Sequence, residues 1–236
     1  MEIQHLVNVF ELESRLLDAT LRDHPVLGRL FSRDFADVSP DALRKAYVQL
    51  LGLKIEYVQY TVPALRAAGE ALCTGDADDR RWSALFLSYA AGESDSRAGQ
   101  ERGHQVWARS DMRALGASPE LLDRRPHPAA LMYRTYFIDE VARHPYAILG
   151  AKGVLEHFSL RVSDDLVAGI VASGVANAEH ATSFFAHHGK LDVAHVRDGD
   201  RNLARLRDAS RRLQVVEGAC MASGIYRLLA DHLLAA

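Results

Sequence analysis

The strongest constraint on the fold is the long helical pattern of residues 39–72, SPDALRKAYVQLLGLKIEYVQYTVPALRAAGEAL. Ser39 stands where a helix N-cap is expected, and Pro40 occupies the first helical position, which tolerates the missing N–H of proline. Apolar residues then recur every three to four positions, which is the period of an amphipathic helix. The segment is therefore predicted to be a helix, with a bend before Pro63.

Similar helix start and stop signals recur along the chain, while alternating β-type runs are scarce. Trp82 is expected to begin a helix that Gly92 and Gly99 weaken or interrupt. Ser163 is expected to cap a long helix that continues to residue 195. Further helical segments are predicted at residues 100–116, 129–144, 145–162 and 200–235. We therefore predict an all-α bundle of about seven to nine helices.

Composition indicates an ordinary globular protein, because 48% of the 236 residues are hydrophobic and 25% are charged. No linker divides the chain, so one domain is expected over residues 1–236. A formal net charge of −3 with mixed signs gives no electrostatic basis for binding nucleic acid or a membrane surface. The longest uncharged run, residues 166–178, is shorter than the roughly 20 residues of a membrane-spanning helix. The two cysteines, Cys73 and Cys220, suit a reducing compartment, so we expect a cytoplasmic protein.

Residues 187–195, HHGKLDVAH, place polar side chains in a segment that otherwise resembles a buried helix. On a helix, His188, Asp192 and His195 follow one another at i+4 and i+7 and fall within a sector of about 60°. Two imidazoles and a carboxylate are costly to bury in a bundle unless something satisfies them. A bound metal ion would do so, whereas a chance spacing among the 11 histidines is the alternative.

Two other segments offer metal ligands. Glu101 and His104 are three residues apart, the spacing that helical carboxylate-bridged di-iron proteins use, although an ordinary surface pair has the same spacing. Glu156 interrupts an apolar helix face flanked by Gly150 and Gly153, which permit close helix approach. A carboxylate there is either a buried acid with a cationic partner or a metal ligand.

Taken together, these segments offer three carboxylates and three imidazoles: Glu101, His104, Glu156, His188, Asp192 and His195. A mixed set of nitrogen and oxygen ligands without a thiolate suits Fe or Mn better than a structural zinc site. About 10 Å of helical rise separates His188 from His195, which favours two adjacent metal ions over one.

The order and spacing of these residues resemble the heme-oxygenase-like di-iron oxidases, a family that shares its fold with heme oxygenases, thiaminase-type proteins and pyrroloquinoline-quinone synthases. The resemblance covers most of the chain, and the most specific element is His-x3-Asp-x2-His after Glu156. The segments that carry it are HPVLGRLF, VSPDALRKAYVQLLGLKIEYV, GHQVWARSDMRALG, ILGAKGVLEHFSL and FFAHHGKLDVAH. It implies a heme-oxygenase-like fold, with His104, Glu156, His188, Asp192 and His195 as iron ligands.

The first carboxylate ligand is open between Glu101 and Glu93, since family members carry a glutamate shortly before the first histidine. An unbroken helix would separate Glu93 from His104 by about 16 Å. Glu101 is therefore favoured, and Glu93 is the alternative if the intervening segment folds back. Glu56 and Glu70 are weaker candidates for a further glutamate ligand.

The resemblance implies an oxidoreductase in which two Fe(II) ions and O2 oxidise a small-molecule substrate. N-oxygenation, desaturation and oxidative C–C cleavage of amino acids or fatty-acid-like molecules remain open, usually in natural-product or cofactor biosynthesis. Arg97 and Arg134 are candidates for holding a substrate carboxylate through a bidentate contact. The sequence also leaves open whether the chain forms a homodimer.

The sequence also leaves open two functions other than a di-iron oxidase. The segment LESRLLDATLRDHPVLGRLF resembles the N-terminal helix of a heme oxygenase, with His24 in the place of the axial ligand, which would imply heme binding or degradation. A metal-free, thiaminase-like protein would need a nucleophilic cysteine, and neither Cys73 nor Cys220 has a convincing sequence setting.

Overall fold

The computed structural model describes residues 3–93, 104–122 and 125–234, and the regular structure in these ranges is entirely helical. The α-helices are α1 (Ile3–Arg22), α2 (Gly28–Ser32), α3 (Pro40–Leu72), α4 (Ala77–Glu93), α5 (His104–Ala114), α6 (Pro119–Leu122), α7 (Pro128–Arg134), α8 (Ala147–Ala172), α9 (Ser183–Leu203) and α10 (Ala209–Leu233). Three short segments are a π-helix, η1 (Thr135–Asp139), and two 3-10 helices, η2 (Val141–Arg143) and η3 (Ala178–His180). None of the helices in the described ranges is long and apolar enough to cross a membrane.

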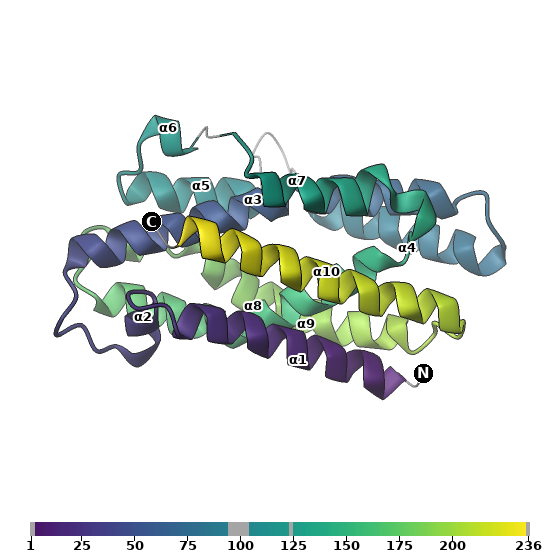
Figure 1. Cartoon of the computed structure of the whole chain (residues 1–236), viewed down its shortest axis with the longest axis horizontal. Coiled ribbons are helices and arrows are strands. Elements are labelled where there is room, and N and C mark those ends of the chain that lie inside the picture. Colours follow the sequence, from purple (N-terminus) through teal and green to yellow (C-terminus); the bar gives the residue numbers. More distant parts are fainter. Residues whose placement is uncertain (1–2, 94–103, 123–124, 235–236) are drawn as a thin grey trace.

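The centre of the bundle is α8, which packs against α1, α9 and α10. On the other side of the molecule, α3 packs against α4 and α5. The first and last helices, α1 and α10, lie side by side along the bundle, although they come from opposite ends of the chain (Figure 1). The long helices therefore enclose a common apolar core between α3 and α8.

The α3 helix begins as its sequence predicts. Ser39 has extended backbone angles, and its hydroxyl accepts a hydrogen bond from the backbone N–H of Ala42 at 3.2 Å. Pro40 opens the helix, which continues through Pro63 to Leu72.

Close helix approach at Gly150 and Gly153 is confirmed. A Cβ atom at Gly150 would lie 1.9 Å from the backbone oxygen of Val215 on α10. A Cβ at Gly153 would lie 2.4 Å from the ring of Phe10 on α1. Since either clash would push a neighbouring helix away, these glycines let α8 occupy the centre of the bundle.

The predicted helix from Ser163 to residue 195 is wrong. Ser163 lies inside α8, where it is buried and its hydroxyl pairs with that of Ser159 at 3.2 Å. The break comes after α8, where Gly174 (φ 75°) and Asn177 (φ 60°) adopt left-handed backbone angles that end a helix. The histidine-rich segment therefore begins a separate helix, α9.

Three other helix boundaries differ from the prediction. The α4 helix begins at Ala77, five residues before the expected start at Trp82. Residues 129–144 do not form one α-helix, because α7 widens into the π-helix η1, where the N–H of Glu140 reaches back to the carbonyl of Thr135 at 2.9 Å. The last helix begins later than residue 200, because Asp208 caps α10 by accepting the N–H of Arg211 at 2.9 Å. None of these changes moves a residue of the predicted metal site out of its helix.

Candidate metal centre

Four helices bring most of the predicted ligands to one cavity of about 60 Å³. Glu93 is the last residue of α4, and His104 is the first residue of α5. Glu156 lies in the middle of α8. The α9 helix carries His188, Asp192 and His195, which have the i, i+4 and i+7 spacing of one helical face. The cavity is lined, among others, by Glu93, His104, Glu156, His188 and Asp192.

Asp192 lies between the two histidines of its own helix. Its Oδ2 atom is 3.2 Å from Nδ1 of His188, and its Oδ1 atom is 3.3 Å from Nδ1 of His195. Burial by itself would raise the pKa of this carboxyl, but the contacts with the two imidazoles outweigh burial and hold its pKa well below the usual range. Asp192 is therefore an ionised carboxylate that faces both histidines.

Glu156 and His195 form a second contact, between α8 and α9. Oε1 of Glu156 lies 3.2 Å from Nδ1 of His195. The carboxylates of Asp192 and Glu156 raise the pKa of His195 to about 9. Glu156 also pairs with Lys152, one turn earlier on α8, whose ammonium is mostly buried. Lys152 is thus the cationic partner that was considered for Glu156, and it lies next to the candidate ligands.

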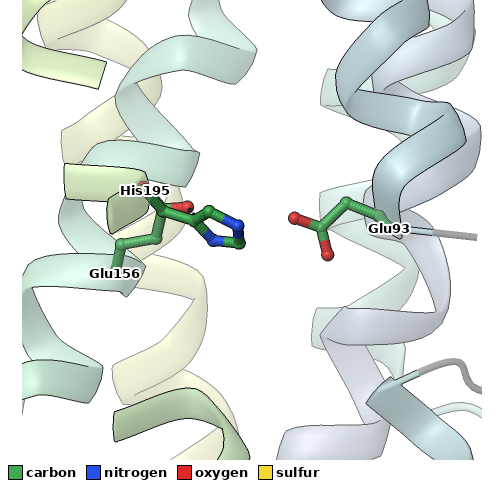
Figure 2. Close-up of side chains that lie close together, drawn as sticks. All are labelled: Glu93, Glu156 and His195. Carbon is green, nitrogen blue, oxygen red and sulfur yellow. Dashed lines mark ion pairs between the residues drawn. The ribbon is translucent and has the colours of Figure 1, made fainter. Parts of the chain in front are cut away.

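Glu93 approaches the cluster from the opposite side (Figure 2). Its Oε2 atom lies 2.8 Å from Nε2 of His104, and its side chain is only 10% exposed. Ligand atoms of Glu93, Glu156 and His195 lie within 4.8 Å of one another. Burial alone would raise the pKa of Glu93, but the positive neighbours, with His104 first, lower it to about 2.

A single unbroken helix would hold Glu93 about 16 Å from His104, but the two side chains are in contact and belong to separate helices, α4 and α5. Helix geometry therefore does not exclude Glu93 as a ligand. Glu101, the preferred candidate from the sequence, lies outside the described residues and stays a prediction.

Aromatic rings hold the histidines in place. The His104 and His188 rings meet edge to face with centroids 4.5 Å apart. Trp107 stacks on His104 at 5.5 Å and on His187 at 4.3 Å, each with an interplanar angle of 18°. Phe184 covers His188 at 4.5 Å. These contacts restrict the rings without using their nitrogen atoms.

Asp111 fixes the start of α9 against α5. Its carboxylate accepts the backbone N–H groups of Ser183 at 3.1 Å and Phe184 at 2.8 Å, which are free at a helix N-terminus. Asp111 is fully buried, so this contact fixes where the ligand-bearing helix begins.

Two buried polar atoms at the centre of the cluster have no hydrogen bond among the described residues. They are Nε2 of His188 and Oε2 of Glu93, whose short contact with His104 does not have hydrogen-bond geometry. Unsatisfied buried polar atoms are unusual, and an imidazole nitrogen and a carboxylate oxygen are both metal ligands. The donor set and these unsatisfied atoms therefore fit an iron site.

The weaker glutamate candidates lie elsewhere. Oε2 of Glu56 accepts the backbone N–H of His127 at 2.9 Å, and Glu70 is exposed on α3. Arg134, considered as a carboxylate-binding residue, is 55% exposed and lies 3.7 Å from Asp139. Arg97, the other such candidate, lies outside the described residues.

His24 is not arranged as an axial heme ligand. Its Nδ1 atom accepts the N–H groups of Val26 at 3.2 Å and Leu27 at 3.0 Å, and Nε2 donates to the carbonyl of Leu234 at 2.8 Å. Both ring nitrogens are thus used to cap the turn after α1. The cysteines give no support to a thiaminase-like nucleophile, because neither lines the cavity of the cluster, and partial burial and the neighbouring Glu13 raise the pKa of Cys220.

Sequence reasoning missed two buried lysines, Lys54 and Lys152, which line the cavity. Lys54 stands in the run LLGLKIEYV, where the available signal is a lysine with apolar residues on both sides in an otherwise mostly apolar helix. Lys152 is four residues before Glu156, the spacing of a helical ion pair. Burial lowers the pKa of Lys54 well below its ordinary value.

A solved structure and a family model match this chain. A crystal structure of a domain of unknown function with a heme oxygenase-like fold, from Shewanella denitrificans, is similar to 94% of this chain and 89% of its own, with a TM-score of 0.70 at 16% sequence identity. The predicted all-α, heme-oxygenase-like fold is confirmed. The search of curated proteins gave no match. The family model of iron-containing redox enzymes matches residues 58–226, most of the chain. This chain therefore belongs to the family of iron-containing redox enzymes.

Proposed function

We propose that this chain is a non-heme di-iron oxidase or oxygenase that uses O2 to oxidise a small molecule. The family supports an iron-containing redox enzyme. The proposed ligands are Glu93, His104, Glu156, His188, Asp192 and His195, with Glu101 as the alternative to Glu93.

The observation that carries the proposal is the pair of carboxylates that link two groups of ligands. Asp192 faces both His188 and His195 through different oxygens. Glu93 contacts His104 and lies within 4.8 Å of ligand atoms of Glu156 and His195. Two carboxylates shared between two sets of donors suit two metal ions about 3.5–4 Å apart, as in other two-metal sites.

When bound, two Fe(II) ions would supply the electrons and the open coordination positions for reducing O2. The chain contributes the ionised carboxylates and the surrounding apolar side chains. Ile148, Leu155 and Phe184 line the cavity beside the ligands and keep bulk water away from the substrate. We expect an amino acid or fatty-acid-like substrate that undergoes N-oxygenation, desaturation or oxidative C–C cleavage in a biosynthetic pathway.

The test is O2 consumption by anaerobically Fe(II)-loaded protein across a panel of amino acids and fatty acids. One substrate class should accelerate O2 uptake in the parent chain but not in Asp192→Asn, which keeps the shape of the side chain and loses its charge. An optical spectrum of the same sample distinguishes the rival, because a heme protein would show a Soret band. Uptake that no substrate accelerates, or that Asp192→Asn retains, would contradict the proposal.

A further inference from the structure

We propose that Lys54 binds the carboxylate of the substrate, so that the cavity selects small molecules with an anionic end group. The identification of the ligand as a substrate rests on the proposed function. The binding of an anion by Lys54 is a separate claim, and it follows from the surroundings of the ammonium group.

Lys54 is a buried lysine that lacks a counter-ion at contact distance. It lies in the middle of α3, is only 2% exposed and lines the same cavity as His188 and Asp192. Within the described part of the chain, Nζ makes no ion pair or hydrogen bond. An ammonium held this way is costly unless a ligand supplies the negative charge.

Aromatic rings surround the ammonium and fix its position. Nζ lies 4.3 Å from the ring centroid of Phe158, 4.7 Å from Tyr226, 5.6 Å from Phe185 and 5.8 Å from Tyr57. These rings come from α3, α8, α9 and α10, so the whole bundle holds the lysine. Ring faces stabilise a cation but leave it without a hydrogen-bond acceptor. A carboxylate would supply the acceptor and the charge together.

Asp192 does not fill this role. Its negative charge acts on Lys54, but its two oxygens lie against His188 and His195, and it forms no ion pair with the lysine. Lys54 therefore has no contacting acceptor among the described residues, although it lines the same cavity as the candidate ligands. A substrate carboxylate at Lys54 would place the following carbon atoms in the cavity that these ligands share.

The cavity has the size and lining for a small amphiphilic acid. Its volume of about 60 Å³ holds only a few heavy atoms, since a benzene-binding cavity is about 150 Å³. Its apolar wall includes Val58, Leu65 and Leu155. The end group and first carbons of a carboxylic acid match this combination of one cation and an apolar wall.

The probe pair for the experiment is propionate and 1-propanol, which share a short carbon chain and differ in charge. Binding to the metal-free chain is measured by calorimetry, so that the carboxylate has no iron to bind. The test variant is Lys54→Met, and the matched control is Lys45→Met, an exposed lysine on the same helix. We expect Lys54→Met to weaken propionate binding by about tenfold or more. Lys45→Met should leave propionate binding unchanged, and 1-propanol should bind all three chains alike.

Folding is checked separately by thermal unfolding, and Lys54→Met should remain folded because it replaces a buried charge by an apolar side chain. If it does not, Lys54→Gln serves as the neutral variant. The inference is overturned if the neutral variant binds propionate as tightly as the parent, or if the parent does not bind propionate. Iron content is measured on the same proteins. A chain that fails to bind iron but needs Lys54 for propionate would contradict the proposed function and retain this inference.

Discussion

Nε2 of His104 lies 2.8 Å from Oε2 of Glu93, although the two residues stand on different helices. This contact makes Glu93 a candidate ligand for the ion that His104 binds. Glu93→Gln keeps the size of the side chain and removes its charge, so it should lower the iron content of Fe(II)-loaded protein by about one ion per chain. Iron analysis after gel filtration measures this loss.

The control for Glu93→Gln is Glu120→Gln, an exposed glutamate on α6. Glu101→Gln is compared with both. Full iron content in Glu93→Gln together with a loss in Glu101→Gln would show that Glu101 is the ligand and that the contact between Glu93 and His104 has another role.

Lys152 would compete with a bound metal ion for Glu156, because its ammonium pairs with that carboxylate. Lys152→Met leaves Glu156 with its contact to His195, and removing one member of a buried ion pair costs up to about 3–5 kcal/mol. We therefore expect the metal-free variant to unfold at a clearly lower temperature than the parent. Added Mn(II) should stabilise the variant more than it stabilises the parent. Equal stabilisation of the two chains would show that Lys152 and the metal do not share Glu156.

The stability of the metal-free protein should depend on His195 at alkaline pH. The carboxylates of Asp192 and Glu156 raise the pKa of His195 from 6.5 to about 9. A group with a raised folded-state pKa contributes its full stability below pH 6.5 and loses it as the pH rises through about 9. The free energy of unfolding, measured with urea at pH 6.5 and at about pH 9, should fall more in the parent than in His195→Gln. His180→Gln, at an exposed position, should behave like the parent.

Trp107 should report metal binding through its fluorescence. It stacks on His104, whereas Trp82, the other tryptophan, packs against Phe86 and Tyr146 away from the cluster. Paramagnetic Mn(II) should therefore quench the fluorescence of the parent and of Trp82→Phe. The quenching should be largely lost in Trp107→Phe. Quenching that depends on Trp82 instead would place the bound ion elsewhere in the molecule.

The close contact between α8 and α10 predicts opposite effects for two glycine substitutions. Gly150→Ala places a methyl group against the backbone of Val215 and should destabilise the protein strongly. Gly199→Ala, in α9, meets no atom within 4 Å and should stabilise the helix by about 0.5–1 kcal/mol. Chemical denaturation of both variants measures the difference. A neutral Gly150→Ala would contradict the packing of α8 against α10.

Helix type and the spacing of the α9 ligands could be predicted from the sequence because they depend on local periodicity. The cap at Ser39 and the glycines at 150 and 153 likewise depend on local chemistry. The continuation of α8 through Ser163 was not predictable, since a serine hydroxyl can cap a helix or pair with a neighbouring hydroxyl inside one. Only the tertiary environment selects between these two roles.

The approach of Glu93 to His104 could not be derived from helix geometry, because the two residues belong to separate helices whose relative placement is tertiary. The buried positions of Lys54 and Lys152 could not be predicted from the sequence for a similar reason. A lysine in an apolar run is ordinarily assumed to reach the solvent, and only the packing of four helices shows that Lys54 is enclosed by aromatic rings.

The central claim is that His188, Asp192 and His195 help to hold two iron ions, and the number of ions per chain tests it most directly. The full chain is loaded anaerobically with Fe(II), freed of unbound metal and analysed beside the double variant His188→Ala, His195→Ala. The account predicts about two irons per chain in the parent, as expected for a two-metal site, and at most one in the variant. Stoichiometric binding of two irons by the double variant, or no iron in the parent, would contradict it.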